Sequence, residues 1–367
     1  MAGIHTGENM KTYRLAFIPG DGVGREVARE TQQTIEACGK LFSFATDCTT
    51  FSWDCDYYLK NGCMMPEDGL ETLKKFDAIF LGSVGDPAKV PDHISLGSLL
   101  TIRKGFDQYI NLRPIQLHKG VPTPVTTATP ETVDMVVVRE NTEGEYSRLG
   151  GIFSPDAPHG FASQMAIFSR VGCERVMRYA FELARKRKAL GGKGKVTNCT
   201  KSNALNFSMV YWDKIFKEVA AQYPDIETNY LLVDALSMIM LTNPGQFDVI
   251  VASNLFGDII TDLGSVLQGG IGFAAGANLN PERTFPSMFE PIHGSALALA
   301  GKNMVNPIAA IESGRLMLDY LGEEKASLSL LRAVQSVLGE GRVSTRDAGG
   351  TSSTSEVGDA IRAALRA

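Results

Sequence analysis

The feature that most constrains the fold of this chain is an alternation of short apolar runs with longer amphipathic stretches. The apolar runs are rich in β-branched residues and have the length of strands that are buried on both faces. They occupy residues 14–19, 76–82, 135–139 and 248–253. Helix-like stretches separate them, at residues 24–38, 174–188 and 212–223. Strands that alternate with helices form a largely parallel sheet covered by helices, so the sequence predicts an α/β fold.

Size and composition narrow the class of protein. A chain of 367 residues is long enough for two lobes, and its hydrophobic fraction of 44% is ordinary for a globular protein. The net charge of −5 without a basic block argues against nucleic acid as a partner. No apolar stretch approaches the roughly 20 residues that span a bilayer, so we expect no membrane partner. Six cysteines without a CxxC pair and an amino terminus without a signal-peptide core favour a cytoplasmic location.

Two aspartates follow the apolar run at residues 247–253. Asn254 comes directly after the run and is expected to cap a helix that carries both aspartates. Asp258 and Asp262 are four residues apart, so they lie on one face of that helix. Open α/β sheets bind ligands at the carboxyl ends of their strands. Neighbouring carboxylates repel unless a cation binds them, and their oxygen atoms suit Mg²⁺ or Mn²⁺. An isolated pair of this kind is more often a solvated acidic face, but the residues below favour a metal site.

A glycine-rich turn follows the first apolar run. Gly20, Gly22 and Gly24 invite comparison with a dinucleotide-binding fingerprint, but only one residue separates the last two glycines. That fingerprint requires two residues there. We therefore interpret the segment as a tight strand-to-helix turn that borders a ligand, and we do not predict a Rossmann fold.

Cationic and phenolic side chains lie near the ends of predicted strands. Arg103, Arg113 and Arg139 suit a substrate with two carboxylates, because guanidinium groups bind carboxylates through two hydrogen bonds. Arg139 ends a buried run and is the strongest candidate. Tyr146 follows it by seven residues and can act as a general acid if neighbouring cations lower its pKa.

Lys201 and Asp234 also follow strand-like runs. A lysine beside a metal ion and arginines has its ammonium form disfavoured, so Lys201 is a candidate base. Asp234 supplies a third carboxylate, either for the metal or as the partner of Lys201. A small-residue loop that begins at Glu290 and ends near Asn306 allows a nucleotide to approach the backbone, although an ordinary surface loop fits this pattern equally well.

Together these motifs resemble the metal-dependent β-decarboxylating dehydrogenases, the family of isocitrate, isopropylmalate, D-malate and tartrate dehydrogenases. The resemblance extends from about Arg14 to the carboxyl terminus. The motifs that match in order are IPGDGVG, NLRP, RENTEGEY, TKSN, SNLFGDIITDLG, EPIHGSA and NPIAA. The D-malate/tartrate subgroup is the most similar, through VPDHISL, FDQYINLRPI, LNPERTFPS and YWDK.

The resemblance implies a two-lobed isopropylmalate-dehydrogenase-like fold. Residues 1–108 and 267–367 would form a discontinuous domain with the nucleotide-binding loop, and residues 109–266 a second domain. The Gly-, Pro- and Ser-rich segment at residues 147–163 reads from composition as an exposed loop, but the resemblance implies a dimer-forming arm. It also implies a homodimer with a shared active site, in which Lys201 and Asp234 of one chain meet Asp258 and Asp262 of the other.

The implied activity is the NAD- and Mg²⁺- or Mn²⁺-dependent oxidative decarboxylation of a 2-hydroxy dicarboxylic acid, of the D-malate/tartrate type. K⁺ is a candidate additional cofactor. The implied metal ligands are Asp234, Asp258 and Asp262, and the implied catalytic residues are Lys201, Tyr146 and Asp234. The implied substrate-binding residues are Arg103, Arg113, Arg139, Leu99 and Leu100. The implied cofactor-binding residues are Asn203, Glu290, His293, Gly294, Ser295, Ala296, Ala298 and Asn306.

The sequence departs from the family pattern in two loops. Ala298 stands where NAD-dependent members have an aspartate that binds the adenosine ribose, and the Lys-Tyr pair of NADP-dependent members is absent. We keep NAD as the predicted cofactor and expect weaker ribose recognition. The loop after Leu96 is one residue short, so Leu99 and Leu100 become candidates to contact an apolar substituent.

These departures leave two alternatives open. The first is a dehydrogenase for 3-isopropylmalate or another alkylmalate, or a paralogue from a specialised pathway. The second is a catalytically silent member that binds metabolites or partners. The presence of every chemical residue argues against the silent member, because such proteins commonly lose those residues first.

Overall fold

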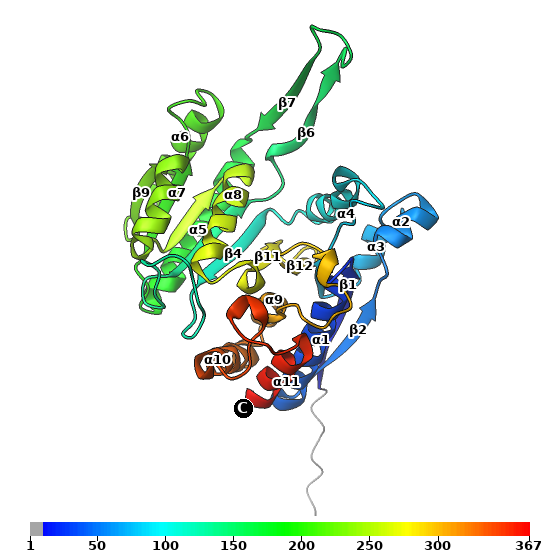
Figure 1. Ribbon diagram of the computed structural model, residues 1–367. Helices are drawn as coiled ribbons and strands as arrows, with labels where there is room; N and C mark the ends of the chain where they lie inside the picture. The colour runs from blue at the N-terminus through cyan, green and yellow to red at the C-terminus, as the bar shows by residue number, and fades with distance from the viewer. Residues whose placement is uncertain (1–9) are drawn as a thin grey trace, which may run out of the picture. The chain divides into compact units, whose positions relative to one another are not determined.

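The computed structural model describes residues 10–367 and divides into two compact units (Figure 1). The first unit contains residues up to Leu96, Phe289–Arg346 and Gly350–Ala367, and the second contains Gly97–Met288 and Asp347–Gly349. The domain boundaries at residues 108 and 266 that the resemblance implies stay a prediction. The first residues of the chain, on which we based the expectation of no signal peptide, lie outside the described residues.

The first unit contains strands in the order β2-β1-β3-β12, and β1 is parallel to both of its neighbours. The strands are β1 (Lys11–Gly20), β2 (Phe44–Thr50), β3 (Ala78–Ser83) and β12 (Ser287–Pro291), of which β12 begins in the second unit and ends in the first. Its helices are α1 (Gly24–Phe42), α2 (Cys55–Asn61), α3 (Gly69–Leu73), α9 (Ile308–Leu321), α10 (Glu324–Glu340) and α11 (Thr354–Ala364). Every residue of β3 and β12 is buried, as expected for strands at the centre of a layered fold.

The second unit contains strands in the order β11-β4-β5-β10-β8-β9. These are β4 (Ile110–Gln116), β5 (Asp134–Glu140), β8 (Lys195–Thr200), β9 (Glu227–Leu232), β10 (Val249–Ala252) and β11 (Ala275–Leu279). The helices are α5 (Arg170–Ala189), α6 (Ser208–Ala220), α7 (Val233–Thr242) and α8 (Asn254–Leu267). Helix α4 (Asp92–Gly105) begins in the first unit and ends in the second. Short 3₁₀ turns complete the chain, at Pro244–Gln246, Ile271–Phe273, Leu297–Leu299 and Arg346–Ala348.

The predicted α/β class is confirmed, and each predicted strand and helix overlaps an element of the structure. The sheet is more mixed than the sequence indicated. Strand β4 is antiparallel to both β5 and β11. Residues 117–133 join β4 to β5 without a helix, and a connection of this kind suits antiparallel neighbours, because a parallel crossover is usually helical.

The segment at residues 147–163 is not an irregular loop. It belongs to a two-stranded antiparallel hairpin formed by β6 (Gly144–Phe153) and β7 (Phe161–Ile167), which extends away from the strands and helices of its unit (Figure 1). Large apolar side chains on it are exposed, with Ile152 at 72% and Phe161 at 61%. The composition-based expectation of a loop was wrong, and a projecting arm is present, while its part in forming a dimer stays a prediction. None of the helices between residues 10 and 367 is long and apolar enough to cross a membrane.

Candidate functional site

Helix α8 follows β10 directly and carries both predicted metal aspartates. Its cap is Ser253, whose hydroxyl accepts a hydrogen bond from the amide of Phe256 at 3.5 Å. The expectation that Asn254 caps the helix was wrong. The side-chain oxygen of Asn254 instead accepts hydrogen bonds from Nε and Nη2 of Arg139, at 3.1 and 2.8 Å. Asn254 therefore fixes the guanidinium of Arg139 beside the first turn of α8.

The carboxylate of Asp258 lies where three predicted site residues meet. Its Oδ1 accepts a charged hydrogen bond from Arg139 and lies 3.2 Å from Nη2 of Arg113. Its Oδ2 accepts a hydrogen bond from the hydroxyl of Tyr146 at 2.8 Å. Arg139 and Arg113 are buried, at 1% and 6% exposure. Because buried guanidinium groups need a counter-charge, Asp258 is an electrostatic requirement of this cluster as well as a candidate ligand.

The electrostatics of the cluster correct one expectation. Burial raises the pKa of Tyr146, the charge of Asp258 and the hydrogen bond to it raise it further, and Arg139 only partly opposes this. Arg139 and Arg113 do lower this pKa, but burial and Asp258 outweigh them, so the expectation of a lowered pKa was wrong. The phenol stays protonated well above neutral pH, and this is the form from which a general acid donates a proton.

The pKa values of the two aspartates of α8 are shifted in opposite directions. Burial by itself raises the pKa of Asp258, but Arg139, Arg113 and the Tyr146 hydrogen bond outweigh burial and hold that pKa below its ordinary value. The residue Asp262 is exposed overall, but its carboxyl group is partly shielded from water, and this raises its pKa. The charge of Arg113 opposes the rise, and the charge of Asp258 adds to it. A carboxylate whose charge is disfavoured in the free protein gains by binding a cation.

The other predicted substrate residues belong to α4 and β4. Arg113 on β4 donates a hydrogen bond to the hydroxyl of Thr261 on α8, which orients it toward Asp258. Arg103 in the last turn of α4 is buried, and its charge lowers the pKa of Asp258 and of Arg139. Leu99 and Leu100 are half-buried on the same helix, about one turn before Arg103.

Lys201 and Asp234 form a second, separate pair. Lys201 follows β8 and Asp234 lies in the first turn of α7, and Nζ of Lys201 donates a hydrogen bond to Oδ1 of Asp234 at 2.7 Å. This hydrogen bond is the main reason that the pKa of Asp234 is lowered. The predicted partnership of the two residues is therefore present, within one chain.

One chain does not bring the predicted metal ligands together. Among residues 10–367, no group of three or more His, Cys, Asp or Glu side chains is placed to hold a metal ion. The donors themselves fit Mg²⁺ or Mn²⁺, because all three are carboxylates and such ions prefer hard oxygen ligands. A site completed by a second copy of the chain stays a prediction.

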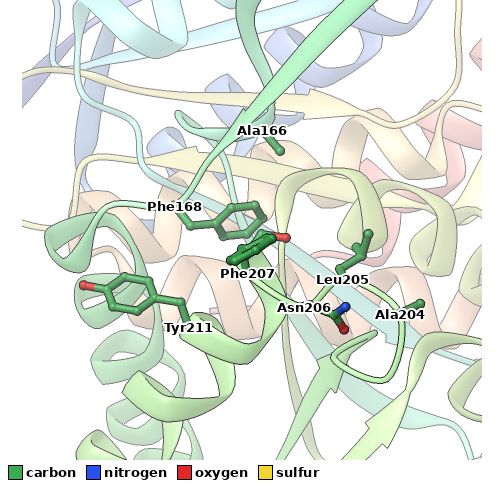
Figure 2. A pocket seen from close by; sticks show the side chains of 8 residues that line it. Ala166, Phe168, Ala204, Leu205, Asn206, Phe207 and Tyr211 are labelled. Atoms are coloured by element: carbon green, nitrogen blue, oxygen red, sulfur yellow. The ribbon is translucent and has the colours of Figure 1, made fainter.

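An apolar recess of about 570 Å³ lies beside the loop that carries Lys201 (Figure 2). Phe168, Phe207 and Tyr211 line it with residues of the 204–208 segment, and Phe207 is 91% exposed. No predicted site residue lines this recess. Asn203, the one predicted cofactor residue in the second unit, is exposed just before it.

The remaining predicted cofactor residues lie on one loop of the first unit. Glu290 is the penultimate residue of β12 and is buried. His293 is also buried, and its ring Nδ1 lies 3.0 Å from the carbonyl oxygen of Gly294. Ala296 has a φ of 38° and directly precedes the short 3₁₀ turn at Leu297–Leu299. Ala298, in the middle of this turn, is exposed. At the end of the loop, the side-chain oxygen of Asn306 accepts a hydrogen bond from the amide of Ile308 at 3.0 Å. Ser295, between Gly294 and Ala296, contacts the glycine-rich turn.

A family model described as isocitrate/isopropylmalate dehydrogenase matches residues 14–361. The chain belongs to the isocitrate/isopropylmalate dehydrogenase family. It is 49% identical over 358 residues to a tartrate dehydrogenase/decarboxylase of Pseudomonas putida, covering 95% of this chain and 97% of that protein. It is 48% identical over 359 residues to a D-malate dehydrogenase [decarboxylating] of Escherichia coli, covering 96% and 98%. The crystal structure of isocitrate dehydrogenase from Methylococcus capsulatus matches with a TM-score of 0.86 at 34% identity, over 97% of this chain and 100% of that one.

The predicted family and fold are thereby confirmed, and this member of the isocitrate/isopropylmalate dehydrogenase family is an oxidoreductase of the dehydrogenase/decarboxylase class. Sequence reasoning missed the supporting roles of three residues. Glu145 holds the start of α8 by accepting hydrogen bonds from the Ser253 hydroxyl at 3.0 Å and the Leu255 amide at 3.1 Å. Asn254 and Thr261 bind the two arginines. A sequence signal existed for all three, because Glu145 lies within the RENTEGEY motif and Asn254 and Thr261 lie within the SNLFGDIITDLG motif.

Proposed function

We propose that this chain catalyses the NAD- and Mg²⁺- or Mn²⁺-dependent oxidative decarboxylation of a 2-hydroxy dicarboxylic acid of the D-malate/tartrate type. The observation that carries the proposal is the convergence of Arg113, Arg139 and Tyr146 on Asp258. This arrangement combines cations for a dianionic substrate, a protonated phenol and a metal-ligating carboxylate. The names of the relatives, tartrate dehydrogenase/decarboxylase and D-malate dehydrogenase, support the same chemistry.

The residues have distinct roles in this proposal. Asp258 and Asp262, with Asp234 of a second copy, would hold the divalent ion, which supplies Lewis acidity when bound, while NAD supplies the hydride acceptor. Arg103, Arg113 and Arg139 hold the substrate carboxylates and orient the bond that breaks.

Two proton transfers complete the reaction. Lys201 of the second copy would remove the proton of the substrate hydroxyl while hydride leaves the carbon that bears this hydroxyl. The lysine must be neutral before it can accept the proton. The resulting β-keto acid loses CO₂, and Tyr146 donates a proton to the carbon from which CO₂ departed. The raised pKa of Tyr146 supports its role as the donor.

We propose a homodimer because the predicted ligands are divided between two clusters of one chain. The β6–β7 hairpin supports this proposal, since an isolated two-stranded hairpin with exposed Ile152, Phe153 and Phe161 is only marginally stable in water. Six free cysteines are in keeping with a reducing, cytoplasmic environment, which we retain as part of the proposal.

The proposal is tested by measuring NADH formation from D-malate, tartrate, 3-isopropylmalate and isocitrate with Mn²⁺ and K⁺. We expect turnover with D-malate or tartrate and its loss when EDTA removes the metal. Absence of turnover with all four acids would refute the proposed activity.

An alkylmalate is the second candidate substrate. The half-buried Leu99 and Leu100 on the helix that carries Arg103 favour it, because apolar side chains beside a carboxylate-binding arginine suit an alkyl substituent. A higher kcat/KM for 3-isopropylmalate than for D-malate would decide for this alternative.

A further inference from the structure

The turn between β1 and α1 is held rigidly within the first unit. The carboxylate of Asp21 is buried and accepts hydrogen bonds from the amides of Cys55 at 3.0 Å and Gly85 at 2.9 Å. The amide of Asp21 donates to the carbonyl oxygen of Ser83 at 2.8 Å. Hydrogen bonds to a buried charge are strong and geometrically restrictive. Helix α1 therefore starts from a fixed point of the unit.

This turn makes the first of two attachments to the predicted cofactor loop, at Ser295. The amide of Val23 donates a hydrogen bond to the carbonyl oxygen of Ser295 at 2.9 Å. Gly22 has a φ of +56°, and a Cβ atom there would lie 2.0 Å from the same oxygen. Only glycine permits this approach of the two backbones, so the start of the loop is fixed to the turn.

Glu26, in the first turn of α1, makes the second attachment. Its Oε2 accepts a hydrogen bond from the amide of Gly301 at 3.0 Å, and its Oε1 accepts one from the amide of Asn303 at 2.7 Å. Asn303 has a φ of 54°, a conformation that non-glycine residues adopt only when their surroundings hold them there. One carboxylate thus fixes the end of the loop.

The segment between the two attachments presents its side chains outward. Leu297 and Leu299 are 40% and 38% exposed, and Ala298 between them is also exposed. Ala298 has no side-chain acceptor for a ribose hydroxyl. Recognition of a nucleotide here therefore depends more on the shape of the backbone, and a loop that is already ordered loses less entropy on binding.

We propose that Glu26 is a positioning residue for the cofactor: its carboxylate holds the loop from Ser295 to Asn303 in the conformation that binds NAD. This inference rests on the proposed function, in which that loop binds the cofactor. Glu26 itself does not touch the cofactor in this proposal. Its effect is on the affinity for NAD, and the chemical step is left unchanged.

The experiment compares Glu26→Gln with Glu36→Gln, a matched control on the same helix. Glu36 accepts a hydrogen bond only from its neighbour Gln32 in the described structure, at 2.9 Å. A glutamine at position 26 has one oxygen acceptor, so it can replace only one of the two charged hydrogen bonds. We expect faster amide hydrogen exchange at Gly301 and Asn303 and a rise of about tenfold in the KM for NAD, with kcat within about twofold of wild type. The control should match wild type in both measurements.

One further variant and a set of opposing outcomes make the test decisive. Glu26→Asp keeps the charge at the start of α1 but is too short to reach both amides, so we expect it to behave like Glu26→Gln. Wild-type behaviour of Glu26→Asp would overturn the inference, as would an unchanged exchange rate or an unchanged KM for NAD in Glu26→Gln. Failure of the wild-type protein to reduce NAD with any of the four acids would instead overturn the proposed function, and the inference with it.

Discussion

Replacement of Asp258 by asparagine is the most informative perturbation of this protein. The substitution keeps the size of the side chain and one oxygen acceptor, but it removes the charge that faces Arg139 and Arg113. Both guanidinium groups are buried, at 1% and 6% exposure. Removing one partner from a fully buried ion pair costs roughly 3–5 kcal/mol, because the remaining charge is left uncompensated.

The cost expected for Asp258→Asn is smaller than for a fully buried pair. The side chain of Asp258 is 37% exposed, so water screens part of its interaction with the arginines. Asparagine also keeps an acceptor for Tyr146. We therefore expect Asp258→Asn to lower the free energy of unfolding by about 2 kcal/mol at neutral pH in the absence of metal.

The pH dependence gives a second measure of the same interaction. The folded-state pKa of Asp258 is held below its ordinary value of about 3.9, so its stabilising contribution is complete above that value. The contribution is lost as the pH falls through the folded-state pKa. Below the folded-state pKa, wild type and Asp258→Asn should therefore approach equal stability, and above about pH 5 they should differ most.

The assay is urea unfolding in EDTA, with Asp262→Asn as the matched control. Asp262 lies one helical turn further along α8, and its raised pKa means that its charge does not stabilise the metal-free fold. We expect the control to be as stable as wild type or slightly more so at neutral pH. Equal unfolding midpoints for wild type and Asp258→Asn at pH 7 would refute the role of Asp258 as counter-charge to the arginines.

Three further predictions concern the cofactor loop, the glycine-rich turn and Tyr146. Ala298→Asp restores a ribose acceptor, so the KM for NAD should fall with little change in kcat; an unaltered KM would contradict our interpretation of the loop. Gly22→Ala places a Cβ atom 2.0 Å from the Ser295 carbonyl oxygen at a φ of +56°, and thermal unfolding should show a loss of more than about 1 kcal/mol. Tyr146→Phe loses the 2.8 Å hydrogen bond to Asp258, so we expect a stability loss of about 1 kcal/mol and a much larger fall in kcat. Intact turnover in Tyr146→Phe would exclude it as the proton donor.

Much of the architecture could be predicted from local pattern. Buried strands such as β3 and β10 are continuous apolar runs, and α1 and α5 have clear helical periodicity. The hairpin of β6 and β7 could not be predicted in this way, because its glycines and serines are typical of turns. Its strands are also exposed, so they lack the alternating pattern of a strand that faces a core. The antiparallel direction of β4 also could not be read from its residues, since the pattern of buried residues along a strand carries no mark of direction.

The candidate site shows the same division. Asp258, Arg139 and Tyr146 could be selected from the sequence, because each lies at the end of a predicted strand or soon after one, and each has a side chain suited to the chemistry. Their protonation could not, since the pKa of Tyr146 depends on Asp258, more than 100 residues away in the chain. Asn254 illustrates the limit, because its position suggested a helix cap and its tertiary contact is with Arg139.

The sequence by itself determined the α/β class, the family, and the identities of the acidic, basic and phenolic groups. These properties depend on local periodicity and on residue type, which a linear order of residues records completely. The tertiary structure decided which charges face each other, which hydrogen bonds fix the cofactor loop to α1, and that one chain leaves Lys201 and Asp234 apart from Asp258. Those outcomes depend on distances between residues far apart in the chain, and only folding sets such distances.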